Sequence, residues 1–210
     1  MRFFVSGILV ILMVSTCVLA AAPKPAIVQT QGNWTVEVTF EHPEQISINR
    51  SGQAERYWYV IVSLVNKTGD DVEFYPKCEL MTDTFQIIPA QKAASPALVE
   101  KIKARHASKY PFLEPLGAVG NSILEGDDNA VDIILIFPDF DSAAKSVKVF
   151  VSGLSNETAM VRHPKMTDAD GEPVNVFLRK TLELNYQLGG DEAFRGEQSL
   201  DYQSKRWVMR

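Results

Sequence analysis

Residues 57–65 read YWYVIVSLV, and their apolar side chains fall on both sides of an extended chain, in which neighbouring residues point to opposite faces. Such a run is typical of a central strand that is covered on both faces. Residues 34–41 (WTVEVTFE) alternate between apolar and polar side chains, which predicts a strand with one buried face. Together these stretches favour a fold built from packed β-sheets.

Strand-like stretches recur along most of the chain. The polar segment 66–71 separates residues 57–65 from another apolar stretch, so we expect residues 57–76 to form a hairpin. Further strands are expected at residues 45–49, 79–88, 131–137, 147–151, 174–188 and 205–209.

One segment departs from this β pattern. Ser95 is placed to cap a helix with Pro96 in its first turn, and Leu98 and Ile102 lie one turn apart on the same side. This spacing predicts a short amphipathic helix, inserted between strands at about residues 95–108.

We therefore predict an all-β fold, an antiparallel immunoglobulin-like β-sandwich with one short helical insertion. The Cys-Trp-Cys spacing of antibody domains is absent, so the expected likeness is one of architecture. Residues 22–210 have the length of a single domain with a substantial core.

The N-terminal sequence predicts that the protein is exported. Arg2 precedes an apolar run at residues 8–19 that ends in alanines. This layout is typical of a signal peptide, which we place at residues 1–21, since the run is shorter than the roughly 20 residues of a membrane-spanning helix. The protein is then extracytoplasmic, in the periplasm or cell envelope, or secreted. Retention of the segment as a membrane anchor and lipidation of Cys17 remain as alternatives.

The composition limits the partners. Because the chain carries a net charge of −5, we expect no binding to nucleic acid, and contact with a membrane only through the N-terminal segment if it is uncleaved.

Cys78 is the single cysteine after the predicted signal peptide, so the processed chain has no disulfide of its own and Cys78 is expected to be buried in a strand. No cofactor is predicted, and calcium is the single weak alternative.

Metal binding has one weak set of candidates. Asp168, Asp170 and Glu172 supply the first fragment of a calcium-binding loop. The other ligands of such a loop are missing, so a solvated turn explains these residues better.

Asn-X-Ser/Thr sequons occur more often than chance predicts. Either glycosylation or turns that use the Asn side chain explain them, and we favour turns. The sequons lie at Asn33, Asn49, Asn66 and Asn156.

The sequence lacks the nucleophile elbow, the zinc-protease motif and the phosphate loop, so an enzyme is the less favoured interpretation. Asp139 and Asp141 are candidate carboxylates for a carbohydrate cleft. Aromatic residues at 57–59, 74 and 75 are able to stack on sugars, although a core position is the favoured reading.

Several blocks occur in order from residue 57 onward: 57–59 (YWY), 65–69 (VNKTG), Phe74, Pro76, 82–84 (TDT), 128–130 (DNA), 139–141 (DFD), 179–182 (RKTL) and 207–210 (WVMR). In these blocks the chain resembles an uncharacterised group of exported proteins from planctomycete-type bacteria. The resemblance implies a bacterial origin and a periplasmic or envelope location, and it brings no known activity.

The leading hypothesis is an exported, non-enzymatic β-sandwich protein that binds or scaffolds an envelope component, either a protein or a polysaccharide. One alternative is a carbohydrate-recognising module or a carbohydrate-active enzyme of the periplasm. A second alternative is a calcium-stabilised module of the adhesion type.

Overall fold

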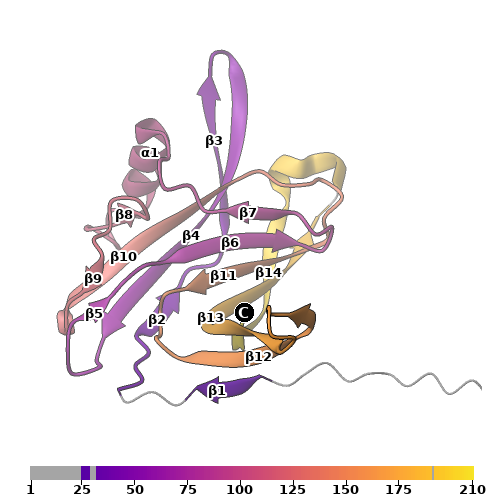
Figure 1. The fold of residues 1–210 in the computed structure, drawn as a ribbon. Helices are drawn as coiled ribbons and strands as arrows, with labels where there is room; N and C mark the ends of the chain where they lie inside the picture. Colours follow the sequence, from indigo (N-terminus) through magenta and orange to yellow (C-terminus); the bar gives the residue numbers. More distant parts are fainter. Residues whose placement is uncertain (1–24, 29–31, 191) are drawn as a thin grey trace, which may run out of the picture.

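The computed structural model describes residues 25–28, 32–190 and 192–210, and this part of the chain forms fourteen strands, the helix α1 (Pro96–His106) and a short 3-10 segment, Glu192–Glu197 (Figure 1). The signal peptide predicted at residues 1–21 lies outside the described residues. The strands are β1 (Ala26–Val28), β2 (Glu37–Phe40), β3 (Glu44–Arg50), β4 (Gln53–Asn66), β5 (Val72–Glu73), β6 (Lys77–Thr82), β7 (Ile87–Pro89), β8 (Glu114–Pro115), β9 (Ser122–Ile123), β10 (Gly126–Pro138), β11 (Ser146–Ser152), β12 (Thr158–Thr167), β13 (Pro173–Gly189) and β14 (Ser199–Met209).

A seven-stranded sheet has the order β1-β12-β13-β11-β6-β7, and β14 also pairs with β13. The long strand β13 organises this sheet, because it pairs antiparallel with β12 along its first half and with β11 and β14 along its second half. Neighbouring residues of a strand face opposite sides. Leu182 and Leu184 therefore face the core, while Thr181 and Glu183 face outward.

A five-stranded sheet has the order β2-β4-β10-β8, and β3 also pairs with β4. Its centre is β4, which contains the apolar run 57–65 and pairs antiparallel with β10 from Tyr57 to Leu64. The short contact between β8 and β10 is parallel. Strands β3 and β4 form a hairpin that extends beyond the body of the protein (Figure 1).

The two sheets pack face to face and enclose the main core. Val60 and Val62 of β4 lie in this core with Val149 of β11 and Leu184 of β13. The structure confirms the predicted all-β class and the two-sheet sandwich architecture.

A second, smaller core explains why residues 57–65 are apolar on both faces. Tyr59 and Ile61 point away from the sandwich interior, and α1 covers them with Leu98 and Ile102. The predicted helical insertion is therefore confirmed, and it makes a third layer on the five-stranded sheet. The capping role expected for Ser95 is wrong, because its side chain makes no capping hydrogen bond. The Ser95 carbonyl accepts the amide of Leu98 instead.

The hairpin predicted at residues 57–76 is also wrong. β4 forms its hairpin with the preceding strand β3, whereas β5 pairs with β9 in a separate two-stranded sheet. The Asn66 side chain accounts for this, since its Nδ2 donates to the carbonyl oxygens of Asp70 and Ile123, each at 2.9 Å. These bonds tie the turn to β9 and lead the chain away from β4.

Two further strand predictions need correction. Residues 79–88 were expected to form one strand, but they fall in two strands, β6 and β7, which pair antiparallel. The chain reverses at Phe85, whose φ of +65° is incompatible with a strand. Strand β12 was not predicted, because Pro164 and the irregular polarity of its sequence hide the period of two.

Candidate ligand-binding face

The outer side of the seven-stranded sheet carries charged residues at its centre. Glu183 of β13 and Glu79 of β6 are both paired with Phe150 of β11, so they flank this ring on either side. Phe150 is buried although it does not belong to either core. We use the name basic face for this region, which comprises Lys77, Lys148, Arg179, Arg206 and Arg210 together with Glu79 and Glu183.

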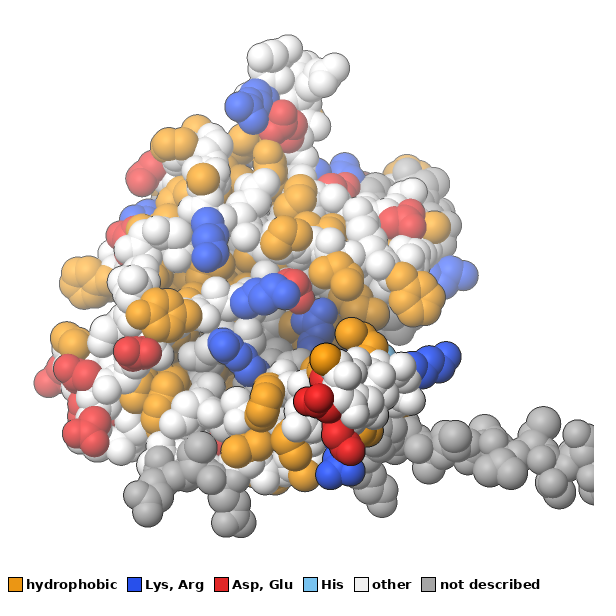
Figure 2. All heavy atoms as spheres, in the orientation of Figure 1, with side chains coloured by type: hydrophobic (Ala, Val, Ile, Leu, Met, Phe, Trp, Pro, Cys, Tyr) orange, Lys and Arg blue, Asp and Glu red, His pale blue; other side chains and the backbone are white. Residues whose placement is uncertain are grey.

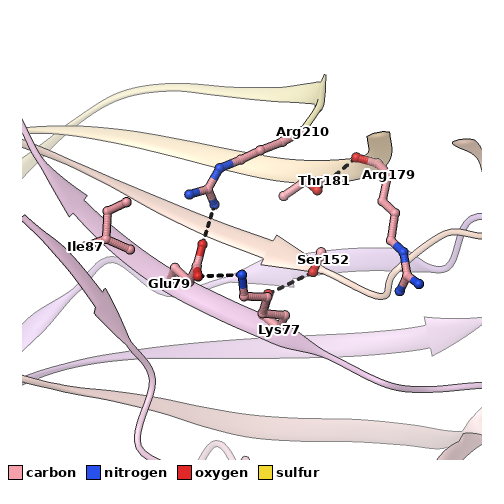
Figure 3. Close-up of a pocket in the computed structure, with 7 residues that line it drawn as sticks. All are labelled: Lys77, Glu79, Ile87, Ser152, Arg179, Thr181 and Arg210. Carbon is pink, nitrogen blue, oxygen red and sulfur yellow. Dashed lines mark hydrogen bonds and ion pairs between the residues drawn. The ribbon is translucent and has the colours of Figure 1, made fainter. Parts of the chain in front are cut away.

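Glu79 holds two cations in place. Its Oε1 is 2.8 Å from Lys77 Nζ, and its Oε2 is 2.7 Å from Arg210 NH1 (Figure 3). The Arg210 guanidinium also lies over the Phe150 ring at 4.1 Å from its centroid, which is a cation–π contact. Burial raises the pKa of Glu79, but the hydrogen bond from Lys77 and the charge of Arg210 outweigh burial and lower it overall.

Glu183 forms a second cluster of the same kind. It is only 4% exposed and accepts hydrogen bonds from Arg206 Nε at 2.6 Å and Asn185 Nδ2 at 2.9 Å. Lys148 Nζ lies at 4.0 Å. Burial raises the pKa of Glu183, and the bond from Arg206 together with the other partners lowers it overall. Both carboxylates of the basic face are therefore ionised and paired.

Arg179 differs from the other cations because its side chain has no hydrogen bond or ion pair within the described part of the chain. Its backbone exchanges two hydrogen bonds with Arg210, of 2.9 and 3.1 Å. Arg179 and Arg210 lie at the rim of a hollow of about 380 Å³ that Thr181 and Ser152 also line. In Figure 3 the Arg210 side chain extends toward Glu79, while the Arg179 side chain extends away from it.

A second hollow of about 290 Å³ adjoins the first and shares Arg179 as a lining residue. Its other walls include the aromatic residues Trp34 and Tyr75 and the amide of Asn156. Tyr75 is 60% exposed. Arg179 thus stands between a basic hollow and a partly aromatic one.

The charge of the basic face is opposite to that of the whole chain. The face has five cations and two carboxylates, whereas the chain has a net charge of −5. Figure 2 shows Lys and Arg side chains gathered in the middle of the viewed face, over β6 and β11. Such a face attracts anionic partners.

The candidate metal ligands lie in the turn between β12 and β13. Asp168 Oδ1 accepts hydrogen bonds from the backbone amides of Asp170 at 3.0 Å and Glu172 at 2.9 Å. Asp168 thus stabilises the turn through the backbone. In the described part of the chain, no group of three or more His, Cys, Asp or Glu side chains is arranged to hold a metal ion.

The two carboxylates expected as candidates for a carbohydrate cleft have structural roles. Asp139 Oδ1 accepts a hydrogen bond from Trp58 Nε1 at 3.0 Å, and its Oδ2 accepts one from Arg56 NH1 at 3.2 Å. Asp141 accepts the backbone amide of Ala143 at 3.0 Å. Asp139 therefore fixes the buried indole of Trp58.

Most of the aromatic cluster belongs to the cores, as expected. Trp58, Tyr59 and Phe74 are each 1% exposed, Tyr57 is half-buried against the smaller core, and Tyr75 is 60% exposed. Cys78 is buried among core residues, also as expected, and this burial raises the pKa of its thiol to about 12.

One sequon asparagine makes contacts within its own turn. The Asn66 side chain is fully buried, and its Oδ1 accepts the backbone amide of Thr68 at 3.1 Å, which agrees with the turn interpretation. Asn156 instead joins distant segments, because its Oδ1 accepts the amide of Trp34 at 2.8 Å and its Nδ2 donates to the Gly32 carbonyl at 3.0 Å.

A polar cluster beside α1 was missed by the sequence analysis. The Tyr59 hydroxyl donates to Glu44 Oε2 at 2.8 Å and lies 2.7 Å from His106 Nε2. Arg105 NH1 donates to Glu44 Oε2 at 3.0 Å. This cluster joins the end of α1 to β3 and β4, so its role is to attach the helix.

The basic face was missed as well. Its residues come from four strands, and no motif in the sequence joins them. The available signal was the placement of charged residues within strand-like stretches, such as Lys148 between Val147 and Val149. In a strand, this placement marks an outward position on a sheet whose other side is core.

Comparison with protein-family models, with curated proteins and with solved structures gives no match for this chain. None of the helices in the described residues combines the length and the apolar character needed to cross a bilayer.

Proposed function

We propose that this protein is exported and binds another component of a bacterial cell envelope through the basic face, without catalysing a reaction. The observation that carries this proposal is the surplus of Lys and Arg on a hollowed sheet face of a chain with a net charge of −5. A protein that concentrates its cations on one face attracts an anionic partner there and repels it elsewhere.

Two features of the sequence support an extracytoplasmic location. Residues 1–21 have the charge and apolar pattern of a signal peptide. The resemblance to exported planctomycete-type proteins favours the periplasm or the cell envelope. The envelope of bacteria is rich in anionic polymers, which suit the charge of the basic face.

The state of the carboxylates favours binding over catalysis. Glu79 and Glu183 are ion-paired, and their pKa values are lowered. A general acid that acts near neutral pH needs a raised pKa, so these groups are poor proton donors. The same ion pairs hold the cations in fixed positions, which suits a site that binds a ligand unchanged.

Co-sedimentation with isolated bacterial envelope fragments tests this proposal. We expect the wild-type protein to sediment with the fragments and the variant Lys77→Glu/Arg179→Glu to remain in solution. The control variant Arg50→Glu/Lys101→Glu makes the same change in charge on the β3–β4 hairpin and on α1, and it should sediment like the wild type. Wild-type protein that stays in solution, or equal sedimentation of both variants, contradicts the proposal.

The location is tested separately by cell fractionation and mass spectrometry. We expect the protein in the extracytoplasmic fractions, with a mass that corresponds to removal of residues 1–20 or 1–21. Intact protein found in the cytosol contradicts the proposed export.

A further inference from the structure

We infer that the basic face binds an acidic polysaccharide, with an acidic group of the polymer at Arg179 and a neighbouring sugar ring on Tyr75. This inference rests on the proposed function and specifies the ligand. Its evidence is the position of Arg179 between a basic hollow and an aromatic one.

The Arg179 guanidinium supplies the main contact for an acidic group. Within the described residues the Arg179 side chain has no counterion, whereas Lys77 and Arg210 share Glu79. The paired backbones of β13 and β14 fix the spacing between Arg179 and Arg210. Guanidinium groups bind carboxylates and sulfates through two parallel hydrogen bonds. An acidic group at Arg179 therefore gains a strong contact without breaking an existing ion pair.

The basic hollow is preorganised for an anion. Glu79 and the Phe150 ring hold Arg210 in one position, so little side-chain entropy is lost when an anion binds. Thr181 and Ser152 line the hollow, and their hydroxyls donate to the backbone carbonyls of Arg179 and Lys77, each at 3.0 Å, which further fixes the two strands that carry these cations. Its volume of about 380 Å³ lies within the usual range for sites that bind small ligands or single residues of a polymer.

The adjacent aromatic hollow suits a sugar ring. Tyr75 is 60% exposed and lines this hollow with Trp34 and Asn156. Exposed aromatic rings present an apolar face that suits the C–H surface of a sugar, and an amide suits its hydroxyl groups. One sugar ring in this hollow is placed directly beside the guanidinium of Arg179.

The carboxylates on and beside the basic face favour a polysaccharide over other polyanions. Glu79 and Glu183 lie among the cations, and Glu73 lines the aromatic hollow. A nucleic acid or an anionic lipid surface presents phosphates at high density and is repelled by these carboxylates. An acidic polysaccharide alternates acidic groups with hydroxyl groups, and hydroxyl groups donate hydrogen bonds to carboxylates.

The polymeric nature of the ligand follows from the extent of the face. Arg206 lies on β14 and Arg210 directly follows this strand, four residues further along an extended chain, which corresponds to about 13 Å. A single small anion does not reach both positions, whereas a chain with repeated acidic groups does.

Binding titrations with defined polymers test the inference. The probes are hyaluronate, which carries one carboxylate per disaccharide, κ-carrageenan, which carries one sulfate per disaccharide, and neutral dextran. At physiological salt we expect one or both acidic polymers to bind and dextran not to bind. The tighter acidic polymer identifies the acidic group. Arg179→Ala should raise the dissociation constant at least about tenfold, because a charge-assisted hydrogen bond is lost.

Matched variants make the test specific for the site. Tyr75→Ala should also weaken binding, whereas Phe112→Ala, which removes an aromatic side chain that is 83% exposed elsewhere, should not. Arg50→Ala removes a cation from the hairpin tip and should leave the dissociation constant unchanged. A thermal unfolding curve for each variant shows that it is folded.

Three results overturn the inference. The first is the absence of binding to both acidic polymers. The second is equal weakening by Arg179→Ala and Arg50→Ala, which indicates a general effect of charge. The third is binding of a single-stranded DNA oligonucleotide or of phosphatidylglycerol vesicles as tight as that of the polymers. If envelope co-sedimentation still depends on Lys77 and Arg179 in these cases, the proposed function stands and only the polysaccharide is wrong. If co-sedimentation is also absent, both the proposed function and the polysaccharide inference are wrong.

Discussion

Two buried tyrosines in this protein have opposite hydrogen-bonding environments. The Tyr59 hydroxyl contacts Glu44 and His106 at 2.8 and 2.7 Å. The Tyr186 hydroxyl has no hydrogen-bond partner within the described residues, although the side chain is only 1% exposed. Its ring packs edge-on against Tyr202 with the centroids 5.9 Å apart. Burial raises the pKa of both tyrosines.

This contrast predicts different effects of the same substitution. Tyr186→Phe should leave the free energy of unfolding unchanged or raise it by up to about 1 kcal/mol, because an unpaired buried hydroxyl is destabilising. Tyr59→Phe should lower it by about 1–3 kcal/mol, because Glu44 and His106 each lose a partner. Urea denaturation with linear extrapolation measures both values. Equal destabilisation by the two substitutions contradicts the assignment.

At the scale of elements, the sequence predicts strands better than it predicts their partners. The periodicity of residues 34–41 and 57–65 is a local property, so β2 and β4 appear where expected. The pairing of β4 depends on distant contacts, such as the bond from Asn66 to the Ile123 carbonyl. No local pattern reports a contact of that kind, and the predicted hairpin at residues 57–76 failed for this reason.

The two-sided apolar character of β4 also has an explanation that the sequence analysis did not reach. Residues 57–65 were interpreted as the interior strand of a sandwich, which accounts for one covered face. The other face is covered by α1, through Leu98, Val99 and Ile102. The helix was predicted from its own spacing, and its position on β4 became evident only in three dimensions.

We therefore expect the helix to contribute strongly to stability. Leu98→Ala and Ile102→Ala should each lower the free energy of unfolding by about 2–5 kcal/mol, because both side chains are fully buried against Tyr59 and Ile61. Glu100→Ala, on the exposed side of α1, should change it by less than about 0.5 kcal/mol. Chemical denaturation of the three variants provides the measurement. A small effect of Leu98→Ala contradicts a packed third layer.

At the scale of the whole molecule, the candidate site is a product of topology. Lys77 and Arg179 are far apart in sequence, and they meet because β11 pairs with both β6 and β13. Sequence patterns single out residues with a recognisable spacing, such as Asp168, which stabilises its own turn, and Asp139, which binds the buried indole of Trp58. A face assembled from four strands has no such spacing.

Ion pairs within and outside the basic face make the stability of the protein depend on pH. Four of the described carboxylates have pKa values below the ordinary value of 4.5. A hydrogen bond from Lys109 lowers the pKa of Glu41, and a hydrogen bond from Lys180 lowers the pKa of Glu157. At Glu79 and Glu183 the cationic partners outweigh burial and lower the pKa overall. Because the folded state prefers the ionised form of each group, their contribution is complete above pH 4.5 and is lost as the pH falls through the folded-state pKa values.

The melting temperature should therefore be nearly constant between about pH 6 and 8 and should fall progressively below about pH 4.5. Glu183→Gln should lower the free energy of unfolding at pH 7 by about 1–3 kcal/mol, because Arg206 loses an ionised partner. The difference from the wild type should shrink as the pH approaches 3, where Glu183 is increasingly protonated in the wild type as well. Glu100→Gln, on the exposed side of α1, should follow the wild-type curve at every pH. Calorimetry from pH 8 to pH 3 measures these curves, and a Glu183→Gln curve that runs parallel to the wild type throughout contradicts the role given to this ion pair.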